Sequence, residues 1–356
     1  METVIITGIF AVFFAYMVRY KSFNYGLEIS FFLIFLFLAL RFNYGNDYAG
    51  YYEIFQYLKV NNLESVSSLH ENIEIGWHYL NKLFLPFGFF TMIAVIAFFN
   101  CIVYYKIIKE FVPRNYYWLS IFLYVFNPYI MLVQSTAMRQ TLVILLFLLA
   151  IRYFLQKRII YYIMMIVFGT FFHSSSWILL IIIPLNYIDF KINNRTIILF
   201  IAFFISLFSV GYFLNDLLEI YMELFLPQYL RHLNQNEVID LKFGMGVFSM
   251  LIILILTLIE TNSQEKKIQL IFKIFAIGFL IIPLSLHVWL ISRGGFYFTA
   301  LSILVYPNII VNMKKKIYQN IFLLLFISLT LYDFYIFFNS PVWIEDFGTY
   351  QTIINK

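Results

Sequence analysis

Charged residues are scarce in this chain of 356 residues: Asp, Glu, Lys and Arg make up 12% of it, against about 25% in a soluble domain. Apolar residues make up 62%, against about 45–50% in a soluble domain. This composition excludes an ordinary soluble protein. It predicts an all-α fold, a polytopic integral membrane helix bundle with residues 1–356 as a single membrane domain.

Cysteine is nearly absent as well, and Cys101 alone cannot form an internal disulfide. The sequence has no Cys pair, no His-Glu-x-x-His and no Asp-x-Asp, so a metal-dependent glycosyltransferase of the usual soluble kind is not supported. It also lacks a Walker motif, a glycine-rich nucleotide loop and a nucleic-acid-binding motif. We therefore expect no metal, no cofactor and no nucleic acid, and any reaction must draw its energy from the substrate itself.

What the chain does have is a series of apolar runs long enough to cross a membrane. They lie at 3–18, 27–42, 87–108, 116–133, 138–155, 196–213, 244–260, 268–291, 294–312 and 317–338. A further block at 159–187 is interrupted near its middle by His173 and three serines, and we predict a short helical hairpin with His173 near its outer tip. About twelve crossings result, two of them in the hairpin, with both termini outside.

The Lys and Arg residues are divided unevenly by this topology. Sixteen of the 24 fall on the side read as cytoplasmic and eight on the outer side, as the positive-inside rule requires. Two acidic outer loops, 43–72 and 214–243, are expected to carry short interfacial helices. The outer face therefore has the material for a functional site.

Three arginines lie on that outer side next to apolar runs: Arg41, Arg139 and Arg293. Charged groups near membrane depth are costly and are generally kept for function, and guanidinium groups pair well with phosphate. We expect the three to form a diphosphate clamp, with Gln140 beside Arg139. The alternative is that each arginine only anchors a helix end in the headgroup layer.

Two residues could act as the general base, His173 and Asp47. The alternatives are a buried histidine bonded to the backbone of the hairpin turn and an aspartate that shapes the turn after Gly45. Tyr48 and Tyr52 follow Asp47 and could stack on sugars. Two further predictions concern local structure. Glu74 is expected to cap the helix that follows it rather than to contact Arg41. Asn127-Pro128 is expected to kink the span 116–133.

Five motifs in order together resemble the signature of EpsG-like proteins, a Wzy-type group of bacterial polysaccharide polymerases. They are Arg41-x-x-x-Gly45-x-Asp47-Tyr48-x-x-x-Tyr52, Glu74-x-Gly76, Met138-Arg139-Gln140, Phe172-His173-x-Ser175 and the late Arg293. Together they cover about residues 40 to 300, most of the chain.

The resemblance implies a multi-pass protein of the bacterial inner membrane that joins repeat units linked to undecaprenyl diphosphate, for exopolysaccharide, capsule or O-antigen. Its partners would be the lipid-linked oligosaccharide and membrane lipid, with a chain-length regulator and a flippase as candidate protein partners. In this reading Arg139 and Arg293 hold the diphosphate, Arg41 assists, and His173 or Asp47 deprotonates the acceptor. A glycan ligase and a lipid-linked oligosaccharide flippase or transporter stay open as alternatives.

Overall fold

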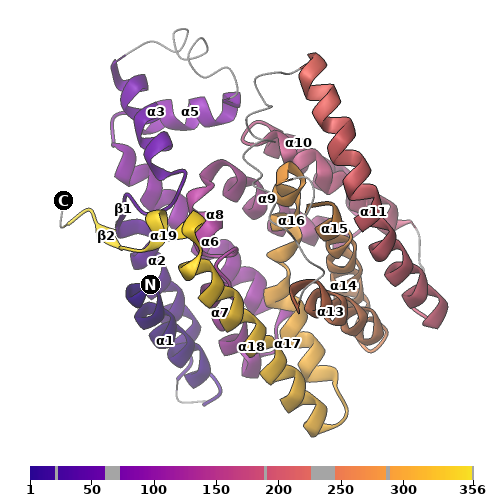
Figure 1. Cartoon of the computed structure of the whole chain (residues 1–356). Coiled ribbons are helices and arrows are strands. Elements are labelled where there is room, and N and C mark those ends of the chain that lie inside the picture. The colour runs from indigo at the N-terminus through magenta and orange to yellow at the C-terminus, as the bar shows by residue number, and fades with distance from the viewer. Residues whose placement is uncertain (21–22, 61–72, 188–190, 226–244, 286–288, 355–356) are drawn as a thin grey trace.

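The computed structural model describes residues 1–20, 23–60, 73–187, 191–225, 245–285 and 289–354. Within them the chain is almost wholly helical (Figure 1). The helices are α1 (Glu2–Met17), α2 (Gly26–Leu40), α3 (Tyr48–Val60), α5 (Ile75–Phe84), α6 (Phe89–Phe111), η1 (Arg114–Tyr116), α7 (Tyr117–Phe126), α8 (Leu132–Thr136), α9 (Met138–Leu155), α10 (Ile159–Thr170), η2 (Ser174–Asn186), α11 (Asn194–Phe225), α13 (Met245–Thr261), α14 (Lys266–Phe279), α15 (Ile282–Ser285), α16 (Trp289–Thr299), α17 (Ser302–Asn312), α18 (Lys316–Asn339) and α19 (Pro341–Phe347). The predicted all-α fold is confirmed.

Five helical stretches among the described residues are long and apolar enough to cross a membrane. They are Phe89–Phe111, Met138–Leu155, Asn194–Gly211, Lys266–Ser285 and Lys316–Asn339. A sixth is formed if Arg293–Thr299 and Ser302–Asn312, which meet at a bend of 40°, make one span. Shorter apolar helices include α1, α2, α10 and η2. The chain is thus a multi-helix membrane protein, and the count of twelve crossings stays a prediction.

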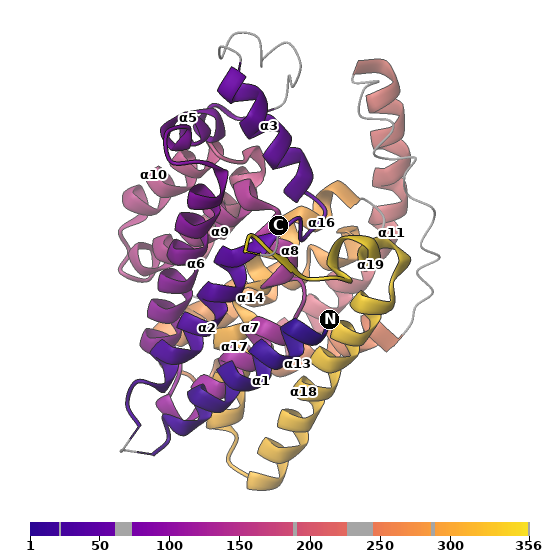
Figure 2. The same cartoon turned by 90° about the vertical axis from the view of Figure 1, so that its left-hand side faces the viewer.

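The most enclosed of these spans is α9, with 61% of its apolar window buried inside the protein, against 17% for α11 and 28% for α18. The core therefore runs through the centre of the bundle along α9, α6 and α14, and α11 and α18 lie at its edge (Figures 1 and 2). This arrangement matters for function because Arg139 stands in the first turn of α9, at the end of the most central helix.

The first residue and the C-terminal segment lie beside each other, since the Met1 ammonium donates to the carbonyl of Gly348 at 3.2 Å. The short strands β1 (Arg41–Phe42) and β2 (Gln351–Thr352) pair antiparallel, with Arg41 opposite Thr352. Gly45 donates its backbone N–H to the carbonyl of Asp346 at 3.0 Å. Its φ of +113° and the 1.8 Å that would separate an added Cβ from a Thr136 methyl explain why glycine is needed there. The C-terminal segment thus covers the Arg41–Asp47 turn.

The predicted kink at Asn127-Pro128 is a full break. Helix α7 ends at Phe126, and the chain resumes helical structure only at Leu132. A residue before proline is disfavoured in the α conformation, and Asn127 has an extended ψ of 107°. Its side-chain oxygen accepts a hydrogen bond from the N–H of Tyr129 at 3.1 Å, which closes a local turn. The span predicted over 116–133 is therefore two helical pieces.

The block 159–187 forms two antiparallel helical arms, as the hairpin prediction requires. The Tyr162 hydroxyl of α10 donates to the carbonyl of Leu179 in η2 at 2.7 Å, and Ser176 Oγ donates to the carbonyl of Ile166 at 3.1 Å. The arms meet between Thr170 and Ser174, so His173 lies at the tip. Whether the arms cross the bilayer stays a prediction.

The two predicted outer loops differ in structure. Residues 43–72 contain the expected short helix, α3, while 61–72 lie outside the described part. Residues 214–225 do not begin a loop but continue α11, which reaches 32 residues. This stretch has no glycine or proline and is rich in leucine and glutamate, which are strong helix formers. The rest of that loop, 226–244, lies outside the described residues.

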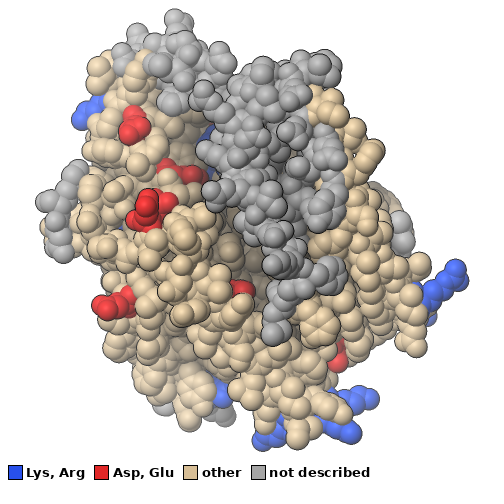
Figure 3. All heavy atoms as spheres, viewed as in Figure 1, with Lys and Arg blue, Asp and Glu red and all other residues tan. Residues whose placement is uncertain are grey.

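Charge is separated along the bundle. In Figure 3 most Lys and Arg side chains visible on this face lie toward the lower end, and most Asp and Glu lie in the upper left half. Helices α17 and α18 are joined at that lower end through residues 313–315, two of which are lysines (Figure 1). Helices α3 and α5 lie at the opposite, upper end. This distribution fits the predicted grouping of basic residues on one face.

Candidate functional site

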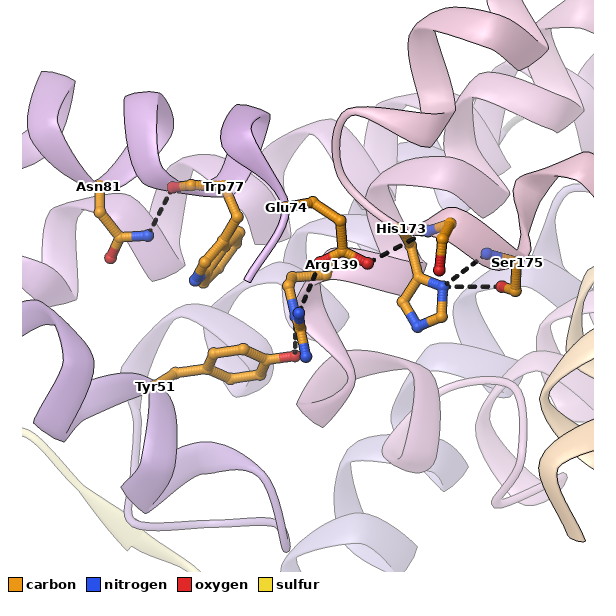
Figure 4. Close-up of polar contacts among 8 residues, drawn as sticks. Tyr51, Glu74, Trp77, Asn81, Arg139, His173 and Ser175 are labelled. Atoms are coloured by element: carbon orange, nitrogen blue, oxygen red, sulfur yellow. Dashed lines mark hydrogen bonds and ion pairs between the residues drawn. The ribbon is translucent and has the colours of Figure 1, made fainter. Parts of the chain in front are cut away.

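An ion pair between Arg139 and Glu74 is the centre of the site. Nη1 of Arg139 lies 2.5 Å from Oε2 of Glu74, and both side chains are mostly shielded, with 23% and 17% of their surface exposed. Figure 4 shows the guanidinium between Glu74 and the hydroxyl of Tyr51. Nε of Arg139 donates to that hydroxyl at 3.4 Å. The position of the cation is thus set from two sides, by residues that belong to the segments preceding α9.

Glu74 does not cap α5 with its side chain, so the capping prediction is wrong. It occupies the N-cap position without a side-chain capping hydrogen bond. Instead Oε1 accepts the backbone N–H of Ser174 at 3.1 Å, while Oε2 pairs with Arg139 rather than with Arg41. A carboxylate gains more from a guanidinium than from a helix end. Glu74 therefore links α9 to the tip of the α10–η2 hairpin.

Gly76 fastens the same two segments through the backbone. Its N–H donates to the carbonyl of Phe171 at 2.8 Å. A Cβ at this position would lie 2.6 Å from that carbonyl oxygen, a distance that no side chain could accept without displacing backbone. The Glu74-x-Gly76 motif thus has a physical basis. The Glu74 carboxylate binds the hairpin tip, and Gly76 lets the backbone of the hairpin approach α5 closely.

His173 stands at this tip as the N-cap of η2. Its Nδ1 accepts the backbone N–H of Ser175 at 3.2 Å, and Ser175 Oγ lies 2.7 Å from the same nitrogen (Figure 4). A backbone N–H can only donate, so Nδ1 carries no proton and the neutral ring holds its proton on Nε2. Ser175 Oγ is also 2.6 Å from the Tyr297 hydroxyl. The neutral His173 ring can therefore donate a hydrogen bond through Nε2.

The charge state of His173 follows from its surroundings. Burial lowers the pKa of His173 to about 4; Glu74 opposes the shift, and the positive charges of Arg139 and Arg293 add to it. The ring is thus neutral at physiological pH. Both cations lie near enough to act on this ring, so the hairpin tip, α9 and α16 share one electrostatic environment.

This lowered pKa predicts how stability depends on pH. The folded pKa of about 4 lies below the ordinary histidine pKa of 6.5, so the contribution of His173 to stability is complete above pH 6.5 and is lost as pH falls toward 4. We expect His173→Asn, which keeps a good N-cap acceptor and removes the titration, to lose less thermal stability over this window. Melting temperatures of both proteins in detergent, measured across the window, test this. Parallel curves would contradict a neutral, buried His173.

Asp47 belongs to the same environment. Burial raises the pKa of the Asp47 carboxyl above its ordinary value, while the positive charges of Arg293 and Arg139 oppose the shift. The same two cations thus act on Asp47 and on His173. Three of the predicted residues, Asp47, Arg139 and Arg293, are brought together with His173 from four separate segments of the chain.

Gln140 contributes to the framework of this cluster. It is 3% exposed, and its Nε2 donates to the backbone carbonyl of Arg293. This bond joins α9 to α16, so it sets the position of the Arg293 backbone relative to Arg139. Gln140 thus lies beneath the site rather than facing open space. Within the described residues no group of three or more His, Cys, Asp and Glu side chains could hold a metal ion.

Arg41 is buried and bound to backbone carbonyls. It is 2% exposed, and its Nη1 and Nη2 donate to the carbonyls of Leu38 and Ser135 at 2.6 and 2.7 Å. These bonds satisfy carbonyl groups at the end of α2 and within α8. In this structure Arg41 joins two backbone segments and is not exposed beside Arg139.

The two predicted tyrosines pack against aromatic side chains. Tyr48 is 1% exposed, its hydroxyl donates to the Arg41 carbonyl at 3.3 Å, and its ring meets that of Phe89 edge-on at 5.6 Å. Tyr52 is half-buried, with its ring 5.2 Å from the ring of Phe89. Tyr48 is thus part of the core, and Tyr52 is the more accessible of the two.

Sequence reasoning missed two residues that order the site, Ser175 and Tyr297. Ser175 is part of the Phe172-His173-x-Ser175 motif but is not among the predicted site residues, and its hydroxyl connects His173 to Tyr297. Tyr297 lies in α16, 122 residues from Ser175, and is fully buried. One signal pointed toward it: it follows Arg293 by one helical turn, so both can face the same neighbour.

The fold and site define a class: a helical membrane protein with a cationic and carboxylate cluster at one end of its bundle. The profile of the EpsG family matches residues 24–352, nearly the whole chain. The chain belongs to the EpsG family, and membership points to a polysaccharide-polymerase-like membrane protein. No curated protein and no solved structure gave a significant match.

Proposed function

We propose that this protein is a polysaccharide polymerase that joins undecaprenyl-diphosphate-linked repeat units on the outer face of the bacterial inner membrane. The observation that carries the proposal is a cluster of charged and polar side chains toward one end of the bundle. In it the charges of two arginines act on both a histidine and an aspartate; the four residues are Arg139, Arg293, His173 and Asp47. A transporter would instead need ionisable groups along a path near the middle of the membrane. A site gathered at one end suits chemistry on a lipid-linked substrate.

The proposed reaction moves a growing glycan from its lipid carrier to the next repeat unit. The acceptor hydroxyl oxygen forms a bond to the anomeric carbon of the donor sugar, while the bond from that carbon to the diphosphate oxygen breaks. The hydroxyl proton passes to the base, and undecaprenyl diphosphate leaves with the bonding electrons. No nucleotide is consumed, because the anomeric phosphate bond supplies the energy.

Arg139 and Arg293 are proposed to hold the diphosphate. Their charge would stabilise the negative charge that grows on the leaving group, in a shielded site where such interactions are strongest. Glu74 and Tyr51 fix the orientation of the Arg139 guanidinium through Nη1 and Nε. Arg41 is proposed to position the Arg41–Asp47 turn through its backbone contacts, instead of touching the substrate.

Of the two candidate bases, Asp47 is the better supported. A general base needs a free lone pair, and the Nδ1 lone pair of His173 already accepts from Ser175. The Nε2 of the neutral ring bears a proton, so His173 suits hydrogen-bond donation to a phosphate or sugar oxygen. The pKa of Asp47 is raised toward the range in which a carboxylate accepts a proton effectively. Tyr52 remains a candidate for contact with sugar.

Reconstitution tests the proposal directly. The purified protein is placed in liposomes with lipid-linked repeat units extracted from a strain that lacks it, without nucleotide sugars. We expect a ladder of glycans that grows by one repeat unit, with release of undecaprenyl diphosphate. Repeat units that become protected from an added glycosidase without growing would identify a flippase. A single transfer to an acceptor without a lipid would identify a ligase.

A further inference from the structure

An apolar groove lies directly beside the candidate site. It has a volume of about 430 Å³, and its walls are residues between Ile75 and Leu83 on one side and Phe168, Phe171 and Phe172 on the other. We call it the α5–α10 groove. Its lining is almost entirely apolar, and its edges are open to the surroundings: Tyr79 is 62% exposed, Leu83 64% and Phe168 51%.

The groove and the polar site share the same two strips of backbone. Glu74 pairs with Arg139, and the next two residues, Ile75 and Gly76, line the groove. On the facing strip, Phe171 and Phe172 line the groove, and His173 follows them at the site. The hydrogen bond from Gly76 to Phe171 holds the strips together at the boundary. The polar site and the apolar groove therefore adjoin within three residues on each strip.

This juxtaposition matches an amphiphile whose charged group and apolar chain are directly bonded. We propose that the α5–α10 groove holds the first isoprene units of the polyprenyl chain while the diphosphate of the same lipid lies at Arg139. The inference rests on the proposed function, since it takes the substrate to be a polyprenyl diphosphate. A volume of about 430 Å³ is near the lower end of ligand sites, about 300–1,000 Å³, so the groove takes only the chain nearest the head.

The direct bond between its charged group and its chain favours a polyprenyl diphosphate over an ordinary membrane lipid in this groove. A phospholipid places a glycerol and two acyl esters between its phosphate and its chains, whereas a polyprenyl diphosphate joins the two directly. A polyprenyl diphosphate could place its diphosphate at Arg139 and its first apolar carbons against Ile75, the residue that follows Glu74. The aromatic walls from Phe168 to Phe172 also offer flat apolar surface to the planar double bonds of isoprene.

Photolabelling tests the groove separately from the reaction. A polyprenyl diphosphate with a diazirine in its first isoprene unit is irradiated with the wild-type protein in liposomes. We expect label in peptides covering 75–83 and 168–172, competed by undecaprenyl diphosphate and not by phosphatidylglycerol. Equal labelling of the lipid-facing α18, or equal competition by phosphatidylglycerol, overturns the inference. If the groove is labelled but no polymer forms, the assignment of the groove holds and the polymerase proposal is overturned.

A pair of matched variants tests its contribution to catalysis. Leu83 in the groove and Leu324 on α18 are both 64% exposed, so replacing either by glutamine makes the same change in side-chain polarity at a similarly exposed position. We expect Leu83→Gln to raise KM for the full-length lipid substrate about tenfold at unchanged kcat, as for a lost contact in an apolar pocket. KM for an analogue shortened to one isoprene unit changes less. Equal effects of Leu83→Gln and Leu324→Gln overturn the inference.

Discussion

Replacing Arg139 with glutamine is expected to lower the rate of glycan polymerisation by about 100- to 1,000-fold, the loss typical when one charge-stabilising donor is removed. The guanidinium is held on one side by Glu74 and on another by Tyr51, so its replacement by an amide removes a cation from a fixed position. Arg139→Lys keeps the charge but loses the planar fork, and we expect it to recover only part of the activity. Reconstituted liposomes with lipid-linked repeat units provide the rate.

A double variant separates chemistry from architecture. Removing Arg139 leaves Glu74 as an unpaired, mostly shielded carboxylate, which alone could disturb the hairpin tip. In the double variant, Arg139→Gln with Glu74→Gln, the unpaired carboxylate is removed. If Arg139 had only an architectural role, the double variant would recover activity. We expect the double variant to remain as inactive as Arg139→Gln. Recovery of activity would show that Arg139 does not bind the diphosphate. The matched control is Arg158→Gln, since Arg158 is an exposed arginine at the start of α10.

Asp47→Asn is expected to have an effect of similar size, about 100- to 10,000-fold on the rate, as for loss of a general base. Asparagine preserves the shape of the side chain and cannot accept the proton. Because the pKa of Asp47 is raised, the wild-type rate should fall as pH drops through a pKa above the ordinary aspartate value. The residual rate of Asp47→Asn should lack this acid limb.

Two comparisons make the pH profile specific. Asp346 lies near enough that its negative charge raises the pKa of Asp47, so Asp346→Asn should move the acid limb to lower pH without abolishing activity. His173→Asn should keep the limb, since Nδ1 of His173 already accepts from Ser175 and Nε2 bears the proton of the neutral ring, so His173 does not act as the base. Glu53→Gln, at an exposed position on α3, the helix that follows Asp47, serves as the control. If the limb disappears in His173→Asn and persists in Asp47→Asn, the assignment of the base is reversed.

Much of the fold could be predicted because hydropathy is a local property. A run such as 138–155 is apolar whatever it packs against, and α9 spans the predicted residues. The hairpin over 159–187 was also predictable, since polar residues interrupt an apolar block at the place where the chain turns. The break at Asn127 went further than predicted, and α11 ran past 213 to Phe225. The ends of helices depend on neighbours that hydropathy does not report.

The site was predictable as a set of residues but not as a set of contacts. Arg41, Arg139 and Arg293 look alike in sequence, each beside an apolar run on the same predicted side. Packing separates them: Arg41 is buried on the carbonyls of Leu38 and Ser135, while Arg139 faces Glu74. Sequence neighbours do not distinguish these outcomes, because Arg41 meets Ser135 across 94 residues and Arg139 meets Glu74 across 65.

The sequence by itself determined that this is a helical membrane protein of the EpsG family, because apolar length and ordered motifs are read along the chain. Only the tertiary structure decided which polar residues meet. The partners of Glu74, the proton position on His173 and the link through Ser175 to Tyr297 each depend on donors brought from distant segments. A hydrogen bond requires atoms within about 3 Å, and that proximity is created by helix packing rather than by order along the chain.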